Sequence, residues 1–307
     1  MKLIIDCGST KADWVILNGK DIISKFQTEG FNPNYTDKNT ISSIILDNTS
    51  YKTYIQEITE IYFYGTGCGN QDNCNIIENV FKSIFLNVNI IVTHDLMAAC
   101  HALFGDKEGI ACILGTGSHS CRYDGNEIID KAVSLGYIIG DEGSGNHIGK
   151  QLLRDYFYKK MPDVLSEKFE KEYDINIISV IDNIYHKNQV SKYLAEFSKF
   201  AYANREHYYI KNLCSECFDE FIEYFILKFN PTANTEIGFV GSIAYYFQDM
   251  LSYCLENKGF RITLHKTKIL AFYKILWYRI DEPKKYKFIK YTRRYLCLKL
   301  KLKVDTN

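Results

Sequence analysis

The sequence has no uninterrupted apolar run that approaches the roughly 18 residues needed to cross a membrane. Its first ten residues, MKLIIDCGST, reach Asp6 after only three apolar residues. A secretory signal needs a longer apolar region, so this start favours a cytoplasmic protein with no membrane partner.

Also missing are the closely spaced cysteines of a small disulfide-stabilised domain. The ten cysteines are scattered over 307 residues, and we expect them to be free thiols. Cys214 and Cys217 form the only CxxC pair, a weak indication of a metal or redox site because a packed helix face gives the same spacing. The length and the hydrophobic share of 46% indicate a globular chain of two domains.

The chain has no net charge, but its charges are unevenly distributed. Residues 261–307 contain 14 Lys and Arg against 3 Asp and Glu, which leaves the preceding part acidic. A basic segment rich in tyrosine can bind nucleic acid or an anionic membrane. We favour a shifted reading frame or a degraded end, because the segment lacks helix caps and a strand–turn rhythm. We therefore expect no nucleic-acid partner and poor packing beyond about residue 264.

Short buried strands separated by helices indicate an α/β fold. Asn18-Gly19 is typical of a two-residue hairpin turn between the second and third strands. Two helices are expected over 40–60 and 75–86. The strands expected in this half of the chain are 3–6, 13–17, 21–26, 61–67 and 88–95.

The same pattern restarts near residue 109. Asp124-Gly125 predicts a second hairpin turn, and residues 161–230 have the spacing of helices. A strand pair with a turn of small residues therefore occurs twice, near 3–17 and 109–123, which indicates a repeat of architecture. The other elements expected in this half are strands over 109–114, 119–123 and 127–133, a helix from about 147 to 158, and, over 236–244, a strand that enters a helix through a glycine turn.

The two repeated turns have the composition of phosphate-binding loops. Both 6-DCGSTK-11 and 115-GTGS-118 are rich in glycine, serine and threonine, so that their backbone N–H groups can approach an anion. Phosphoryl transfer needs such donors, Mg²⁺ and a base in line with the acceptor hydroxyl. Asp6 ends its strand where it could hold Mg²⁺ through water. The predicted ligands of the ATP phosphates are Gly8, Ser9, Thr10, Lys11, Gly115, Thr116, Gly117 and Ser118.

Asp95 stands where a buried strand ends and the helix LMAACHALF begins. The positive end of the helix dipole would keep its carboxylate ionised and ready to accept a proton from a hydroxyl. Capping of the helix is the alternative explanation. Taken alone, each turn and each strand-end aspartate is weak evidence of a phosphate-binding site. The prediction depends on their matching placement in the two halves of the chain.

The motifs DCGSTKADWV, THDLMAACHALFG, ILGTGS, GYIIGDEGSG and GFVGSIA resemble, in this order, those of the N-acetylglucosamine kinases in the BadF/BadG/BcrA/BcrD ATPase group of the actin–hexokinase superfamily. The resemblance covers about residues 1–262, and GDEGSG is its most distinctive part. It implies an α/β fold of two ribonuclease H-like, actin-like ATPase domains, over 1–104 and 105–263, with a cleft between them. Residues 264–307 remain an atypical tail.

The resemblance also implies a function: ATP- and Mg²⁺-dependent phosphorylation of an amino sugar, N-acetylglucosamine being converted to its 6-phosphate. Asp95 matches the base that deprotonates the sugar hydroxyl. Gly241 and Ser242 match the turn against which adenosine packs. A homodimer is one expected assembly. The residues implied to bind the sugar are Asn34, Thr116, His119 and Asp141.

Several points stay open in the sequence. His119 and Leu135 replace residues, Asn and an aromatic side chain, that are common near the sugar in the family, so the acyl-group specificity is open. Asp141 could instead cap the following helix, and Asn34 could simply form a turn beside proline. The family's closing segment is not found after Thr263. Two alternative functions remain: an ATPase activator of a radical dehydratase, with an iron–sulfur cluster, and a non-catalytic sugar- or nucleotide-binding remnant.

Overall fold

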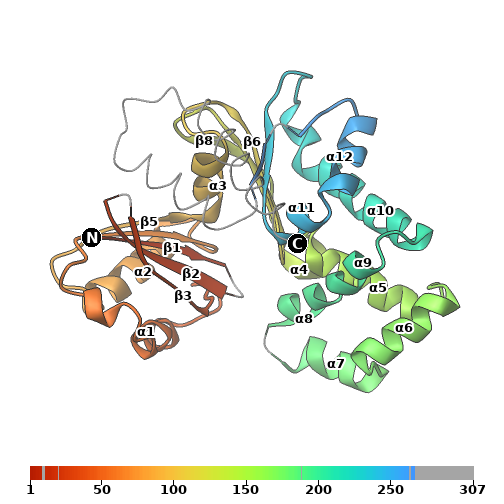
Figure 1. The fold of residues 1–307 in the computed structure, drawn as a ribbon, viewed down its shortest axis with the longest axis horizontal. Helices are drawn as coiled ribbons and strands as arrows, with labels where there is room; N and C mark the ends of the chain where they lie inside the picture. The colour runs from red at the N-terminus through yellow and green to blue at the C-terminus, as the bar shows by residue number, and fades with distance from the viewer. Residues whose placement is uncertain (9–10, 20, 188, 263, 267–307) are drawn as a thin grey trace, which may run out of the picture.

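Two sheets, each combined with helices, form the two halves of the molecule (Figure 1). The computed structural model describes residues 1–8, 11–19, 21–187, 189–262 and 264–266. The predicted α/β class is confirmed.

The first sheet has the strand order β3-β2-β1-β4-β5. Its strands are β1 (Lys2–Cys7), β2 (Lys11–Asn18), β3 (Asp21–Glu29), β4 (Glu60–Gly65) and β5 (Asn89–His94). The first three are antiparallel neighbours, whereas β1, β4 and β5 run parallel. Cys7 is aligned with Gly65 and Gly65 with His94, so the three parallel strands end together at one edge. Residues that follow these strands are therefore neighbours in space.

The second sheet repeats this topology in the order β10-β9-β6-β7-β8. Its strands are β6 (Gly109–Leu114), β7 (Ser118–Tyr123), β8 (Ile128–Lys131), β9 (Ile237–Val240) and β10 (Leu264–Lys266). Again three antiparallel strands are extended by two parallel ones, so the predicted repeat of architecture is confirmed. Pairing of β10 with β9 takes the sheet three residues past the expected domain end at 263. The rest of the basic tail, 267–307, lies outside the described residues.

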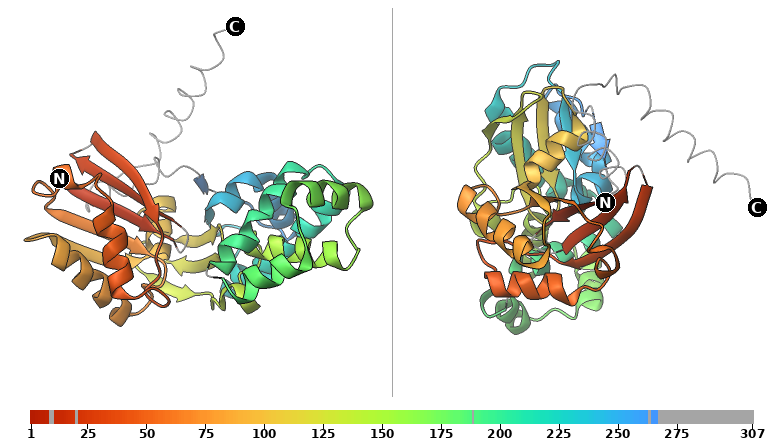
Figure 2. Two further views of the ribbon diagram at one scale, coloured as in Figure 1. Left: turned by 90° about the horizontal axis from the view of Figure 1, so that it is seen from below. Right: turned by 90° about the vertical axis from the view of Figure 1, so that its left-hand side faces the viewer.

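The helices cover the sheets unequally. α1 (Lys38–Asp47) and α2 (Gln71–Ile84) pack on one face of the first sheet. The expected helical region over 161–230 is confirmed, and the helices α5–α10, yellow-green to turquoise in Figure 2, lie at the end of the molecule remote from the first sheet. The helices of the second half are α4 (Gly136–Ile139), α5 (Gly145–Phe157), α6 (Asp163–Tyr173), α7 (Ile177–Tyr185), α8 (Val190–Glu196), α9 (Ser198–Ala203), α10 (Tyr208–Phe225), α11 (Ser242–Tyr246) and α12 (Gln248–Asn257).

α3 (Asp95–Leu103) is in contact with both sheets. Ala98 packs with Tyr64 on the face of the first sheet opposite α1 and α2. Cys100 reaches the second sheet, where its Sγ lies 3.3 Å from Sγ of Cys121. The helix therefore links the two halves, and its first residue is Asp95.

Two local predictions need correction. The helix expected over 40–60 ends at Asp47, and a 3₁₀ turn follows at Lys52–Tyr54. Asn48 Oδ1 accepts from Ser50 N (2.8 Å), a local hydrogen bond that competes with helix continuation. In the first hairpin Asn18 pairs with Asp21 in the sheet, so Asn18 belongs to the strand and not, as expected, to the turn.

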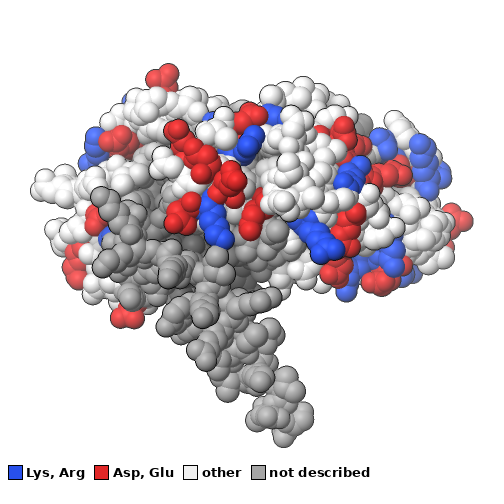
Figure 3. All heavy atoms as spheres, turned by 90° about the horizontal axis from the view of Figure 1, so that it is seen from above, with Lys and Arg blue, Asp and Glu red and all other residues white. Residues whose placement is uncertain are grey.

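The described surface and core are those of an ordinary globular chain. On the face shown in Figure 3, Asp and Glu side chains are interspersed with Lys and Arg. Cys214 and Cys217 lie on the buried face of α10, and the cysteines of the described ranges are free thiols. Within those ranges no helix has the length and hydropathy needed to span a membrane.

Candidate active site

The first candidate turn joins β1 to β2 at the edge where the parallel strands end. Gly8 N donates to Lys11 O (3.0 Å) and closes a two-residue loop. Ser9 and Thr10, the predicted phosphate ligands in this loop, lie outside the described residues. Lys11 Nζ forms an ion pair with Asp13 Oδ2 (3.0 Å). A phosphate bound here would compete with Asp13 for the lysine charge.

Three carboxylates interact at this edge. Asp6 in β1 lies directly opposite Asp13 in β2, so both side chains are on the face of the sheet that α3 covers. Burial, together with the negative charges of Asp95 and Asp13, raises the pKa of Asp6 to about 7, against the opposing charge of Lys11. Asp6 therefore stands in an excess of negative charge, where a cation would be stabilised.

Asp95 is the first residue of α3, as the change from strand to helix predicts. His94 occupies the N-cap, and its Nδ1 accepts from Met97 N (3.3 Å). Asp95 Oδ1 accepts from Leu96 N (2.9 Å). Burial raises the pKa of Asp95, and the bond from Leu96 opposes that rise. Because His94 already caps the helix, capping does not explain the carboxylate at 95.

The second candidate turn, 115–118, joins β6 to β7 and receives the N-terminus of α5. Gly145 N donates to Gly115 O (2.8 Å), and Asn146 N donates to Thr116 O (3.1 Å). The first two residues of α5 are thus bonded to the turn. The structure brings the GTGS and GDEGSG motifs together, although they are well separated in the sequence.

Asp141 lies against the same turn and is buried. Its Oδ1 accepts a long hydrogen bond from Ser118 N (3.5 Å), and its Oδ2 accepts from Asn146 Nδ2 (2.7 Å). A Cβ added to Gly117 would lie 3.0 Å from Asp141 Oδ2, so glycine leaves room for the carboxylate. Burial raises the pKa of Asp141, and the two hydrogen bonds oppose the rise.

Gly241 brings a third motif to this turn. Its φ of +115° is accessible to glycine, and a Cβ at this position would lie 2.2 Å from Leu114 O. Ser242 then begins α11. The predicted adenosine-binding residues are therefore adjacent to the predicted phosphate turn.

His94, at the end of β5 in the first sheet, lies near His119, in β7 of the second sheet. Burial, together with the positive charge of Lys131, lowers the pKa of both His94 and His119 to about 4. The charge of His119 also lowers the pKa of His94, so the two rings lie within electrostatic range of each other. The end of β5, next to Asp95, is thereby close to the strand that follows GTGS.

Asn34 is exposed in the loop that follows β3. Its Oδ1 accepts from Asn73 Nδ2 (2.7 Å), which also donates to Gly67 O (2.7 Å) in the turn after β4. This places Asn34 near the edge where the parallel strands end. Among the described residues, Asn34 forms no hydrogen bond with Asp95 or Asp141.

Sequence analysis does not single out Asp13 or Asn146. Asp13 could be found from the hairpin, because a two-residue loop at 9–10 places 13 directly opposite 6. Asn146 follows GDEGSG without a local pattern that would indicate its role.

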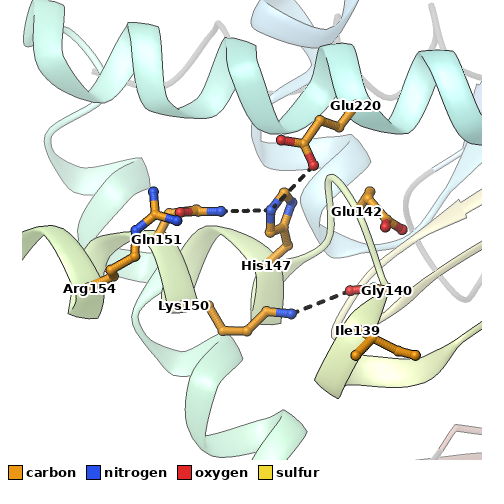
Figure 4. A pocket seen from close by; sticks show the side chains of 8 residues that line it. All are labelled: Ile139, Gly140, Glu142, His147, Lys150, Gln151, Arg154 and Glu220. Atoms are coloured by element: carbon orange, nitrogen blue, oxygen red, sulfur yellow. Dashed lines mark hydrogen bonds and ion pairs between the residues drawn. The ribbon is translucent and has the colours of Figure 1, made fainter.

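A pocket of about 360 Å³ lies beside the 141–147 loop and contains none of the predicted site residues. Two contacts link polar groups of its lining: His147 Nε2 lies 3.0 Å from Gln151 Nε2, and Lys150 Nζ donates to Gly140 O (3.4 Å). The pocket lining consists of Ile139, Gly140, Glu142, His147, Lys150, Gln151, Arg154 and Glu220 (Figure 4).

The class of protein is assigned from the turns, the strand-end carboxylates and the repeated sheets, together with a comparison of the sequence with known families. The profile of the BadF/BadG/BcrA/BcrD ATPase family matches residues 5–209, and the chain belongs to this family. The resemblance noted in the sequence is confirmed.

Particular relatives agree with this assignment. A crystal structure of a candidate N-acetylglucosamine kinase from Porphyromonas gingivalis is 33% identical, covers 92% of this chain and 99% of that chain, and superposes with a TM-score of 0.87. A curated N-acetylmuramic acid/N-acetylglucosamine kinase from Clostridium acetobutylicum is 31% identical over 100 residues, and the alignment spans 33% of each chain.

A more distant structure shares only the fold. It is a ROK family glucokinase from Streptomyces griseus in complex with glucose and AMPPNP, with 12% identity and a TM-score of 0.52 over 90% of this chain and 97% of that chain.

Proposed function

We propose that the chain is an ATP-dependent kinase of an amino sugar, with the 6-hydroxyl of N-acetylglucosamine as the acceptor. One observation carries this proposal: two sheets of identical topology each bear a turn of small residues, and Asp95 begins the helix that contacts both sheets. The two halves would be ribonuclease H-like domains over 1–104 and 105–263, the second extended by β10. The substrates would bind in a cleft between these domains, where both turns could contact the phosphates of ATP.

Asp95 supplies the base. Its carboxylate is at the positive end of α3, which favours the ionised form, whereas burial raises its pKa and makes it a better proton acceptor. As the sugar oxygen attacks the terminal phosphorus of ATP and the bond to the bridging oxygen of ADP breaks, the hydroxyl becomes more acidic and its proton passes to Asp95. Substrate positioning by the two turns supplies most of the remaining rate enhancement.

The ATP phosphates would be held by backbone N–H groups from both turns, 8–11 and 115–118. Gly241 and Ser242 would pack against adenosine, because the turn at Gly241 lies directly beside Gly115 N. Asp6 would hold Mg²⁺ through water, since oxygen ligands in a negatively charged environment suit this ion. When bound, Mg²⁺ neutralises phosphate charge during transfer.

The sugar would lie between Asp95 and the second turn, near Asp141, Thr116 and, from the first half, Asn34. His119 accepts from Ser120 N at Nδ1 (2.9 Å), which leaves the hydrogen on Nε2. A neutral N–H donor fits the carbonyl oxygen of an N-acyl group. This favours N-acylated over unsubstituted sugars.

The test is a coupled ADP-release assay with N-acetylglucosamine, N-acetylmannosamine, N-acetylmuramic acid and glucose. We expect N-acetylglucosamine to stimulate ADP release, with kcat/KM for glucose lower by about 10–100-fold because acyl-group hydrogen bonds are lost. Release that does not depend on the sugar, or no stimulation by any sugar, would contradict the proposal.

A second prediction concerns the charge at Asp6. Its pKa is raised from 3.8 to about 7, so the folded state binds this proton more tightly than the unfolded chain. Stability from this group is fully present below pH 3.8 and is lost as the pH rises through about 7. Without Mg²⁺, Asp6→Asn should therefore raise the free energy of unfolding at pH 8 by on the order of 2 kcal/mol.

Urea denaturation at pH 8 and pH 5.5 checks this prediction. The gain from Asp6→Asn should shrink at pH 5.5, where the native Asp6 carboxyl is protonated. Mg²⁺ should stabilise the native chain at pH 8 but not the variant. A gain of equal size at both pH values would show that charge at Asp6 is not its cause.

A further inference from the structure

We infer that Asn146 is a positioning residue, which holds the Asp141 carboxylate in its sugar-binding orientation. This inference rests on the proposed function, since it assigns a role in sugar binding. Asn146 is fully buried at the start of α5, and Asp141 is buried with only 7% of its surface exposed.

Three hydrogen bonds fix Asn146. Its backbone N donates to Thr116 O (3.1 Å), and its Nδ2 donates to Asp141 Oδ2 (2.7 Å) and to Ser191 Oγ (3.1 Å). Ser191 belongs to α8, so the carboxamide joins the GDEGSG loop to a helix from a distant part of the sequence, while the backbone of the same residue is bonded to the second turn. A single residue thus links Asp141 to the phosphate turn.

The carboxylate of Asp141 needs this support. Its backbone has a φ of +61°, which is uncommon for a residue with a side chain. Its second oxygen has only the long bond from Ser118 N (3.5 Å). The short bond from Asn146 therefore determines the orientation of the group. Because an amide N–H donates to a carboxylate, it also favours the ionised form, against the rise in pKa that burial causes.

A purely structural role explains Asn146 less well. Its Oδ1 is buried and has no hydrogen-bond partner in the described part of the chain. An unpaired buried acceptor costs about 1–3 kcal/mol, so an apolar residue would serve packing better at this position. The two Nδ2 hydrogen bonds account for an asparagine here.

The first experiment compares Asn146→Leu, which removes the donor, with Asn146→Asp, which places a second carboxylate beside Asp141. We expect KM for N-acetylglucosamine to rise about 10-fold in the former and more in the latter, since a lost hydrogen bond to a charged group has this size. KM for ATP and kcat should stay within about 3-fold. The acid limb of kcat/KM for the sugar should move to higher pH in Asn146→Leu.

Asn183→Leu is the matched control. Its Nδ2 donates to Ser179 O within α7 (2.7 Å), so the variant removes a comparable bond away from the site. Its sugar KM and pH profile should equal those of the native protein. If Asn146→Leu does not fold, Ser191→Ala removes the other acceptor of the carboxamide, and a smaller rise in sugar KM is expected. A folded Asn146 variant with native sugar KM and pH profile would overturn the inference.

A direct measurement separates this inference from the proposed function. Carbon-13 NMR of labelled aspartate carboxyls, with Asp141→Asn for assignment, gives the pKa of Asp141 without any substrate. In Asn146→Leu it should rise by about one unit. If the native protein shows no sugar-stimulated ADP release, the proposed function fails while this result can still hold. An unchanged pKa would refute the positioning role alone.

Discussion

Asp95→Asn is expected to lower kcat for sugar phosphorylation by about 10²–10⁴-fold, the usual contribution of a general base. The carboxamide oxygen can still accept from Leu96 N, and His94 still caps α3, so the helix should remain intact. Burial raises the pKa of Asp95, and removing its charge should not destabilise the fold. The affinities for sugar and ATP, measured by calorimetry, should stay within about 3-fold because the base acts mainly in the transition state.

Asp72→Asn is a suitable control, because Asp72 is an exposed carboxylate in the first turn of α2 in the same half of the molecule. This variant should lose only the helix-dipole contribution, a few tenths of a kcal/mol, and keep native activity. Sugar-dependent turnover of Asp95→Asn within about 10-fold of the native rate would exclude Asp95 as the base. Loss of sugar binding would instead assign it a binding role.

The placement of Asp95 could be predicted because an apolar strand followed by an alanine-rich helix fixes the boundary within a residue. The expectation that this strand is buried is wrong: β5 is an edge strand of half-buried and exposed residues. The repeated turns were likewise visible, since each follows a short apolar strand and is closed by its own hairpin. Such features depend on residues close together in the sequence. The end of α1 depends on one side chain, Asn48, which accepts a hydrogen bond from Ser50 N. The helical spacing of apolar residues does not reveal this bond, so the sequence alone does not show where the helix ends.

Long-range contacts set the limit of prediction. The role of Asn146 depends on its hydrogen bonds to Asp141, on the other side of a left-handed turn, and to Ser191, which lies 45 residues away. β10 lies in a basic segment with no strand pattern, and it pairs because β9 offers a parallel edge. The interaction of Asp6 with Asp95 requires three strands and a helix to assemble first. These features arise from the packing of separate elements and leave no periodic signal in the sequence.

Gly241→Ala is expected to destabilise the protein by roughly 3 kcal/mol or more and to raise KM for ATP more than KM for the sugar. Its φ of +115° disfavours any side chain, and the added Cβ would lie 2.2 Å from Leu114 O and 3.1 Å from Gly115 N. All these neighbours are backbone atoms, so relief requires movement of the end of β6. That movement would displace the second turn, where the ATP phosphates are expected to bind.

Gly259→Ala separates the two causes. Gly259 also has a positive φ, +84°, but a Cβ there would have no neighbour within 4 Å. This variant should lose only about 1–2 kcal/mol, from backbone strain, and keep the native KM for ATP. The difference between the two variants, measured by urea denaturation, is the cost of the close approach at Gly241. Equal losses would mean that backbone conformation alone requires glycine at 241, and a native KM for ATP in Gly241→Ala would place the nucleotide away from the second turn.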